Sequence, residues 1–189
     1  MSSFTGTARI VRLVLRRDRL RLALWMGGVT SMVVISAASL LATYPDQATI
    51  DAYGSVFSGN PALVAFAGPG YGMDDPNIGV ILVNEVQLWG LITLGLMSVF
   101  LVNRHTRAEE DVERADLLRS SVLGRHAVAA ATVAVVTAAH VVVAAVCAAG
   151  FVRLECPVAG SIALAGSFLV VGLVFVGVTA VAAQVASTG

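Results

Sequence analysis

Lysine is absent from this chain of 189 residues, and all twelve of its basic residues are arginines. Without lysine there is no Walker A phosphate loop, which ends in Gly-Lys-Ser/Thr, and no Schiff-base site. Charged residues make up only 13% of the sequence, about half of what a water-soluble domain uses. These shortages exclude an ordinary soluble enzyme, and any ATP chemistry must come from another chain.

Cysteine is also scarce, because Cys147 and Cys156 are the only two. Two cysteines are too few for a disulfide scaffold or a zinc cluster, and no spacing of His, Cys, Asp and Glu matches a metal site. No catalytic pair or triad stands out either. The formal net charge is zero, which gives no indication of a nucleic-acid partner. We therefore expect no enzyme activity, no metal and no cofactor bound by this chain.

Apolar residues are abundant, at 57% of the sequence with a mean hydropathy of +0.85. Four uninterrupted runs reach the length of about 20 residues with which an α-helix crosses about 30 Å of hydrocarbon. They predict an all-α, polytopic membrane protein with four transmembrane helices, because backbone groups in lipid must satisfy one another. These helices are expected at residues 22–43, 79–102, 127–151 and 160–184.

The arginines predict the orientation of the spans. Eleven of the twelve lie in residues 1–21 or 103–126, and basic loops stay in the cytoplasm. Residues 44–78 and 152–159 are then extracytoplasmic loops, and residues 185–189 are a cytoplasmic end that we expect to be truncated. The prediction is a multi-pass protein of the cell (plasma) membrane with a cytoplasmic amino terminus.

The amino-terminal segment shows the pattern of an amphipathic helix. Four arginines recur at helical spacing, namely Arg9, Arg12, Arg16 and Arg19. The opposite side carries the aliphatic residues Ile10, Val11, Leu13 and Val14. This pattern predicts an interfacial helix with its arginines toward lipid phosphates and its aliphatic side chains toward acyl chains. Alternatively, the arginines only fix the orientation of the first span.

The loop at 103–126 indicates a short cytoplasmic helix. Thr106 and Glu109 have the spacing of a capping box, Glu110 and Arg114 form an i,i+4 pair, and Gly124 is a suitable terminator. Such a helix is either a solvated connector or a docking device. The adjacent Leu117 and Leu118 favour docking, because a solvated helix gains nothing from them.

The loop at 44–78 contains an apolar stretch, Ala62–Ala67, that is too short to span a membrane and is bounded by Pro61 and Gly68. We expect it to rest on the outer membrane face or to cap the helix bundle. A lid over a substrate exit is the alternative interpretation.

Two ionisable residues lie within the expected spans, Glu85 in the second and His140 in the third. Intramembrane ionisable residues are candidates for a substrate pathway. Alternatively, Glu85 extends to the membrane surface or bonds to Asn84 or Gln87, and His140 is a neutral residue that bonds between helices.

The charged loop also carries a family resemblance. Its motifs are Arg104-His-Thr-Arg-Ala-Glu-Glu110, Glu113-Arg114, Leu117-Leu118-Arg119 and Val122-Leu-Gly-Arg-His126, accompanied by Asn60-Pro61-Ala62-Leu63, Gly68-Pro69, Asn84-Glu85 and Phe100-Leu101-Val102. In these residues the chain resembles the permease subunits of type-2 ABC exporters. It is most similar to the actinobacterial polyketide-antibiotic exporters of the tetronasin type.

The resemblance implies a membrane permease subunit, or the amino-terminal third of one, whose 103–126 loop contains a coupling helix that contacts an ABC ATPase subunit. The residues expected to make that contact are Glu109, Glu110, Glu113, Arg114, Leu117, Leu118 and Arg119. ATP and Mg²⁺ would be bound by the ATPase subunit, and the substrate would be a hydrophobic compound such as an antibiotic, a drug or a lipid. Further permease spans, or a second permease copy, would complete the pathway.

Two other functions are compatible with the residues. One is a small multi-span adaptor or regulator that recruits a cytosolic partner through residues 103–126. The other is an ion-coupled secondary transporter that uses Glu85 and His140.

Overall fold

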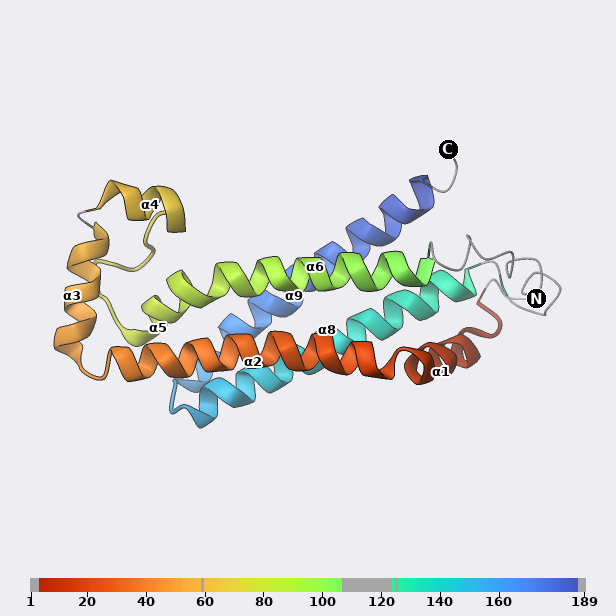
Figure 1. Cartoon of the computed structure of the whole chain (residues 1–189), viewed down its shortest axis with the longest axis horizontal. Coiled ribbons are helices and arrows are strands. Elements are labelled where there is room, and N and C mark those ends of the chain that lie inside the picture. Colours follow the sequence, from red (N-terminus) through yellow and green to blue (C-terminus); the bar gives the residue numbers. More distant parts are fainter. Residues whose placement is uncertain (1–3, 59, 107–123, 125, 187–189) are drawn as a thin grey trace.

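The computed structural model describes residues 4–58, 60–106, 124 and 126–186, and every regular element in these residues is a helix (Figure 1). Four helices are long and apolar enough to cross a membrane. They are α2 (Arg19–Thr43), the continuous helix formed by α5 (Ile78–Leu82), the π-helical turn η1 (Val83–Gln87) and α6 (Leu88–Thr106), then α8 (Ala127–Arg153) and α9 (Val158–Ala186). The prediction of an all-α polytopic membrane protein with four spans is confirmed.

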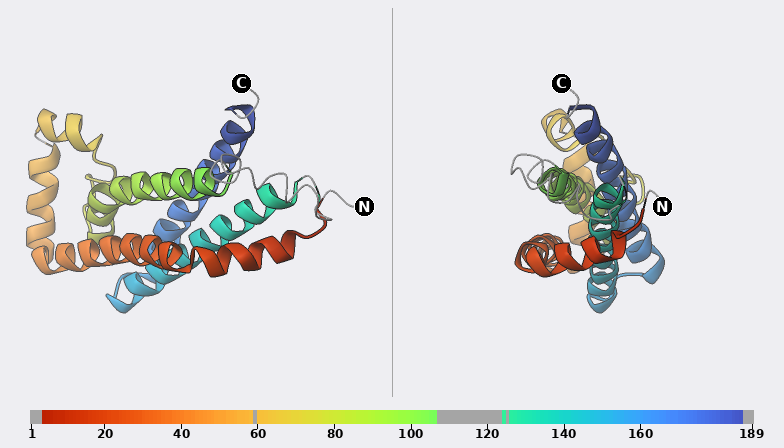
Figure 2. Two further views of the ribbon diagram at one scale, coloured as in Figure 1. Left: turned by 45° about the vertical axis from the view of Figure 1, so that its right-hand side comes forward. Right: turned by 90° about the vertical axis from the view of Figure 1, so that its right-hand side faces the viewer.

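The core lies where α6, α8 and α9 meet, and α2 packs against α8 and α6. Glycine allows a close approach between α6 and α9, because a Cβ atom at Gly90 would lie 2.8 Å from Cε1 of Phe168. Two further views show α9 crossing the bundle obliquely, so that its carboxyl-terminal end leaves the other helices (Figure 2). One consequence is that α9 presents apolar surface that the described residues leave uncovered.

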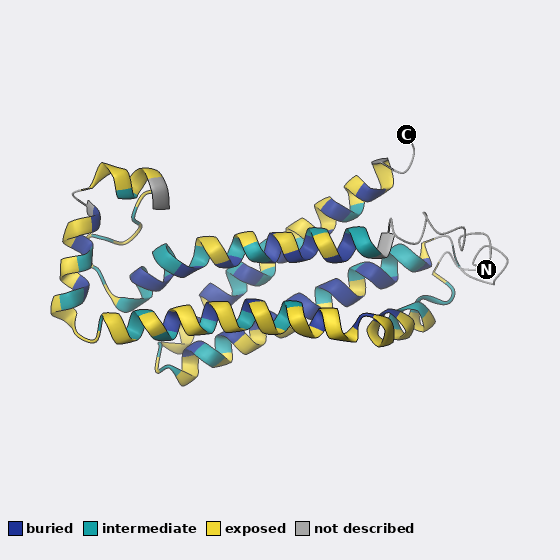
Figure 3. Cartoon of the chain, viewed as in Figure 1, coloured by how far each residue is buried: buried dark blue, intermediate teal, exposed yellow. Residues whose placement is uncertain are grey.

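That uncovered surface follows the helical repeat. Exposed valines recur every three or four residues along α9, at Val170, Val174, Val178, Val181 and Val185. The first span is similarly exposed. In its most apolar stretch 17% of the residues are buried, compared with 44% in each of the second and third spans (Figure 3). Apolar faces of this extent are stable in contact with lipid or with another apolar protein surface.

The amino-terminal helix α1 (Thr7–Arg17) is separated from α2 by Asp18. Its arginines are exposed, but its apolar side chains are not all directed to lipid: Val14 is buried in the core, and Ile10 and Val11 pack against it. Only Leu13 of the predicted lipid-facing set is strongly exposed. Val14 therefore does not face acyl chains, because α1 packs on α8, and the interfacial position of the helix stays a prediction.

The expected loop at 44–78 contains two helices, α3 (Gln47–Ser58) and α4 (Pro61–Ala67), which form an arm at the end of the bundle opposite α1 (Figure 1). Asp46 caps α3, since its Oδ1 accepts the Thr49 N–H at 2.9 Å, and this bond with that of the Thr49 hydroxyl lowers the pKa of Asp46. Asn60 caps α4 in the same way, with Pro61 in the first turn. The sequence analysis identified the apolar stretch of α4 but missed α3.

Candidate functional site

Glu85 lies in the π-helical turn η1, near the α3 end of the second span. A π turn widens the helix and is frequent at functional sites. The Tyr53 hydroxyl, on α3, donates a hydrogen bond to Oε1 of Glu85 at 2.8 Å. Burial, followed by this bond to Glu85, raises the pKa of Tyr53 above its usual value, so the phenol keeps the proton that it donates. The sequence predicted Glu85 as a candidate, but not its partner 32 positions away.

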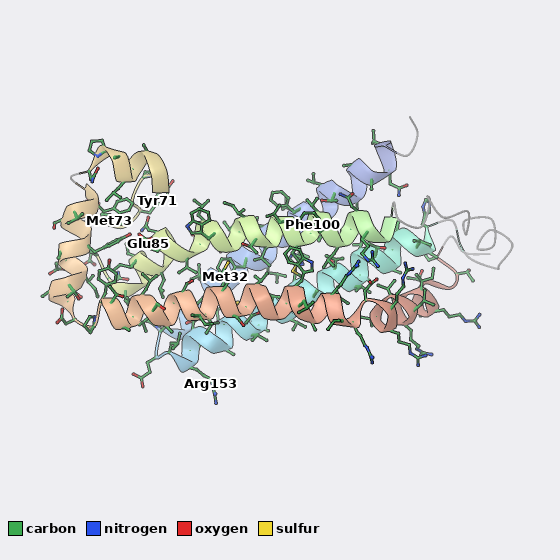
Figure 4. All side chains as sticks on the ribbon, viewed as in Figure 1. Met32, Tyr71, Met73, Glu85, Phe100 and Arg153 are labelled. Carbon is green, nitrogen blue, oxygen red and sulfur yellow. The ribbon has the colours of Figure 1, made fainter. Side chains whose placement is uncertain are left out.

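The two polar neighbours of Glu85 in the same turn bond to other elements. Asn84 donates to the Tyr71 carbonyl at 3.2 Å and accepts the Tyr71 N–H at 3.3 Å. Gln87 donates to Oγ of Ser167 on α9 at 3.0 Å. The turn thus attaches the second span to α3, to the segment before α5 and to α9. Figure 4 shows Glu85, Tyr71 and Met73 in the region between the arm and the bundle.

A cavity of about 350 Å³ opens beside Glu85. Its lining includes Tyr44, Tyr53 and Phe57 from the arm and its base, and Trp89 from α6. The rings of Tyr44 and Tyr53 meet edge to face with 5.4 Å between centroids, and the rings of Tyr53 and Phe57 are tilted with 5.6 Å between centroids. We call this the Glu85 cavity. It combines one partly buried carboxylate with several aromatic rings.

A second cavity, of about 710 Å³, lies between the second span and the turn from α8 to α9. Its lining is mostly apolar and includes Val80, Leu82, Phe151 and Leu164, with Cys156 at the turn. Burial raises the pKa of the Cys156 thiol, which keeps this group neutral in the apolar surroundings. The sequence analysis did not identify this cavity, because its walls come from segments that are far apart in the chain.

His140 is buried between three helices rather than in either cavity. Its Nδ1 lies 3.0 Å from the Val136 carbonyl, and its Nε2 lies 3.0 Å from Oγ of Ser98 on α6. Ser98 in turn lies 3.2 Å from the Gly172 carbonyl on α9. Since the Val136 carbonyl can only accept, Nδ1 carries a proton. Both ring nitrogens are thus engaged within the bundle, as expected for a residue that bonds between helices.

The opposite end of the bundle holds a buried ion pair. Nε of Arg104, at the end of the second span, lies 3.2 Å from Oδ1 of Asp18, which is 4% exposed. Beyond this pair, the exposed Arg9, Arg12 and Arg16 border a surface depression around Leu13. The predicted ATPase-contact residues, from Glu109 to Arg119, lie outside the described residues. The sequence analysis did not identify Asp18 as important.

In the described part of the chain, no group of three His, Cys, Asp or Glu side chains is positioned to hold a metal ion. The two cysteines there are free, with Cys147 buried in α8 and Cys156 in the following turn. The Glu85 cavity offers one carboxylate, aromatic rings and apolar walls to a ligand.

The sequence of this chain is similar to that of a known efflux protein. It is 32% identical over 184 residues to the multidrug efflux system permease protein Rv1217c of Mycobacterium tuberculosis, an alignment that covers 97% of this chain. The chain spans about a third of the length of this curated relative, since the alignment covers 33% of it. No protein-family model matches the chain. With the four apolar helices, the similarity supports a multi-pass membrane protein that resembles part of an efflux permease.

Proposed function

We propose that this chain forms the amino-terminal part of the membrane permease of an ATP-driven exporter, which moves hydrophobic compounds such as antibiotics, drugs or lipids out of the cell. The observation that carries the proposal is the similarity to a multidrug efflux permease over nearly the whole chain. The absence of lysine from the sequence fits a transport subunit whose ATP and Mg²⁺ are bound by a separate ABC ATPase. The tetronasin-type assignment rests on the sequence motifs alone.

The loop between α6 and α8 is the proposed contact with the ATPase. The two helices that flank it end and begin at the α1 end of the bundle, and Arg104, two residues before the end of α6, is tied to Asp18 between α1 and α2. Movement of the loop would therefore be transmitted directly to α6 and α8, and through the ion pair to Asp18 at the junction of α1 and α2. In this proposal the α1 end faces the cytoplasm, with Arg9, Arg12, Arg16 and Arg19 toward anionic lipid phosphates.

The substrate pathway would pass the α3 end of the second span, where Glu85 and its cavity lie. The role proposed for His140 would be indirect, because its two nitrogens already bond within the bundle. The uncovered faces of α2 and α9 would meet lipid and the remaining permease spans, or a second permease copy.

The coupling proposal is tested by co-expressing the permease that contains this chain with a candidate ABC ATPase subunit, sought among the neighbouring genes. Reversing two loop charges, Glu110→Arg with Arg119→Glu, should abolish stimulation of ATP hydrolysis by the permease while membrane insertion is kept. The matched control is Asp74→Arg, an exposed charge reversal at the other end of the bundle.

Unchanged stimulation in the loop variant would contradict the assignment of the coupling helix. The absence of an adjacent ATPase gene, together with flux that a proton gradient drives, would favour an ion-coupled secondary transporter instead.

A further inference from the structure

The carboxylate of Glu85 has no cationic neighbour in its own part of the chain. Residues 22–103 contain no arginine, lysine or histidine. Among the residues that the structure describes, no arginine forms a salt bridge with Glu85, whereas Asp18 has one at the opposite end of the bundle. A partly buried carboxylate within a membrane span is costly unless a positive charge or hydrogen bonds compensate it. Tyr53 supplies one hydrogen bond to Oε1 but no charge.

Aromatic rings line the same cavity as the Glu85 carboxylate. Tyr44, Tyr53 and Phe57 belong to the arm and its base, and Trp89, with 52% of its surface exposed, belongs to α6. The face of an aromatic ring attracts a cation, most strongly for tryptophan. The rings and the carboxylate thus both favour a positively charged ligand. The rings also offer apolar contact, which an organic cation can use and a small hydrated ion cannot.

Size and ligand chemistry separate the kinds of cation. Metal ions such as Ca²⁺ and Mg²⁺ need about six oxygen ligands, and the Glu85 cavity offers a single carboxylate. Its volume of about 350 Å³ lies in the range of small-molecule sites. An organic cation with a bulky apolar body matches all three features, namely the charge, the rings and the volume.

We propose that the Glu85 cavity binds lipophilic organic cations, with Glu85 as the counter-charge and Trp89 and Tyr44 as cation–π partners. This inference rests on the proposed function and gives that permease a substrate class. Tyr53 is the positioning residue, because its hydroxyl donates a hydrogen bond to the Glu85 carboxylate.

The test uses the whole chain in detergent micelles, with tetraphenylphosphonium as the probe. Trp25 and Trp89 are the only two tryptophans, so Trp25→Phe leaves Trp89 as the single fluorescent reporter inside the cavity. Tetraphenylborate, an anion of the same shape, controls for partition into the micelle. We expect saturable quenching of Trp89 by the cation and only a non-saturating response to the anion.

Two variants test whether cation binding depends on the charge of Glu85 and on the aromatic rings. Glu85→Gln should weaken cation binding roughly tenfold or more, and the exposed carboxylate control Asp74→Asn should leave it unchanged. Tyr44→Leu keeps every charge and should weaken binding roughly threefold or more, which tests the site even if Glu85→Gln does not fold. Equal saturable responses to both ions, or wild-type affinity in Glu85→Gln and Tyr44→Leu, would overturn the proposal.

Failure of this inference is distinguishable from failure of the proposed function. If hydrophobic compounds are exported with ATP but cation binding does not depend on Glu85, the proposed substrate class is wrong and the proposed permease function stands. If cation binding depends on Glu85 but no ATP-dependent export is found, the proposed permease function is wrong and the proposed binding site stands.

Discussion

Arg104 and Asp18 are 86 positions apart in the chain, and Nε of the arginine donates a hydrogen bond to the aspartate Oδ1 at 3.2 Å. The pair joins the end of the second span to the point where α1 meets α2. Asp18 is buried while a third of the Arg104 side chain is exposed, so the arginine brings the charge that keeps the carboxylate in place. The packing of α1 on α8 and this contact at its carboxyl-terminal end together hold α1 against the bundle.

Replacing Asp18 with asparagine should destabilise the fold. The change Asp18→Asn leaves the partly buried Arg104 without its charged partner, which costs about 1–3 kcal/mol of unfolding free energy. Thermal unfolding followed by circular dichroism in micelles measures the loss. The control is Asp51→Asn, a loss of the same charge at an exposed position of α3. Equal melting temperatures for the two variants would show that the pair adds nothing to stability.

The contact between Gly172 and His140 should tolerate no extra carbon. A Cβ atom at Gly172 would overlap the His140 ring, so Gly172→Ala must displace that ring from its hydrogen bonds or push α9 away from α8. Overpacking of this kind costs about 1–3 kcal/mol, again measured by thermal unfolding. Gly166→Ala is the matched control on the same helix, because nothing lies within 4 Å of its added carbon. If both variants melt at the same temperature, the close approach of α8 and α9 is wrong.

Stability should fall at alkaline pH because of Tyr53. Burial and the bond to Glu85 raise the pKa of Tyr53 in the folded chain, whereas an unfolded tyrosine titrates near a pH of about 10. The unfolded chain therefore loses this proton first, so the contribution is complete below a pH of about 10 and is lost as the pH rises further. Denaturant unfolding across this range should show a shallower decline for Tyr53→Phe. An unchanged decline would show that Tyr53 is not the group responsible.

The orientation of the spans should be visible by cysteine labelling. With Cys147 and Cys156 replaced by alanine, a single cysteine at Ser55 on α3 should react with an impermeant maleimide added to intact cells. A single cysteine at Ser120, in the loop between α6 and α8, should react only after the cells are lysed. The reverse pattern would place the arginine-rich end outside and contradict the cytoplasmic amino terminus.

The sequence was sufficient for the long helices and for the position of Glu85 within the second of them. It was less informative wherever a helix is short or a partner is distant. The helix α3 has only a modest apolar pattern and depends on its Asp46 cap, and the inward side of α1 became clear only from its packing on α8. Residues 107–123, which carry most of the predicted coupling helix, remain a prediction from the motifs.

In lipid, an uninterrupted apolar run of this length is stable as an α-helix, because the helix forms all of its backbone hydrogen bonds internally. The sequence by itself therefore determined the four long apolar helices. The partners of Glu85, His140 and Asp18 were decided by the tertiary structure. Glu85 meets Tyr53, Ser98 meets His140 and Asp18 meets Arg104 only when the helices have packed, because the angle and register between two helices depend on side chains that a linear pattern does not pair.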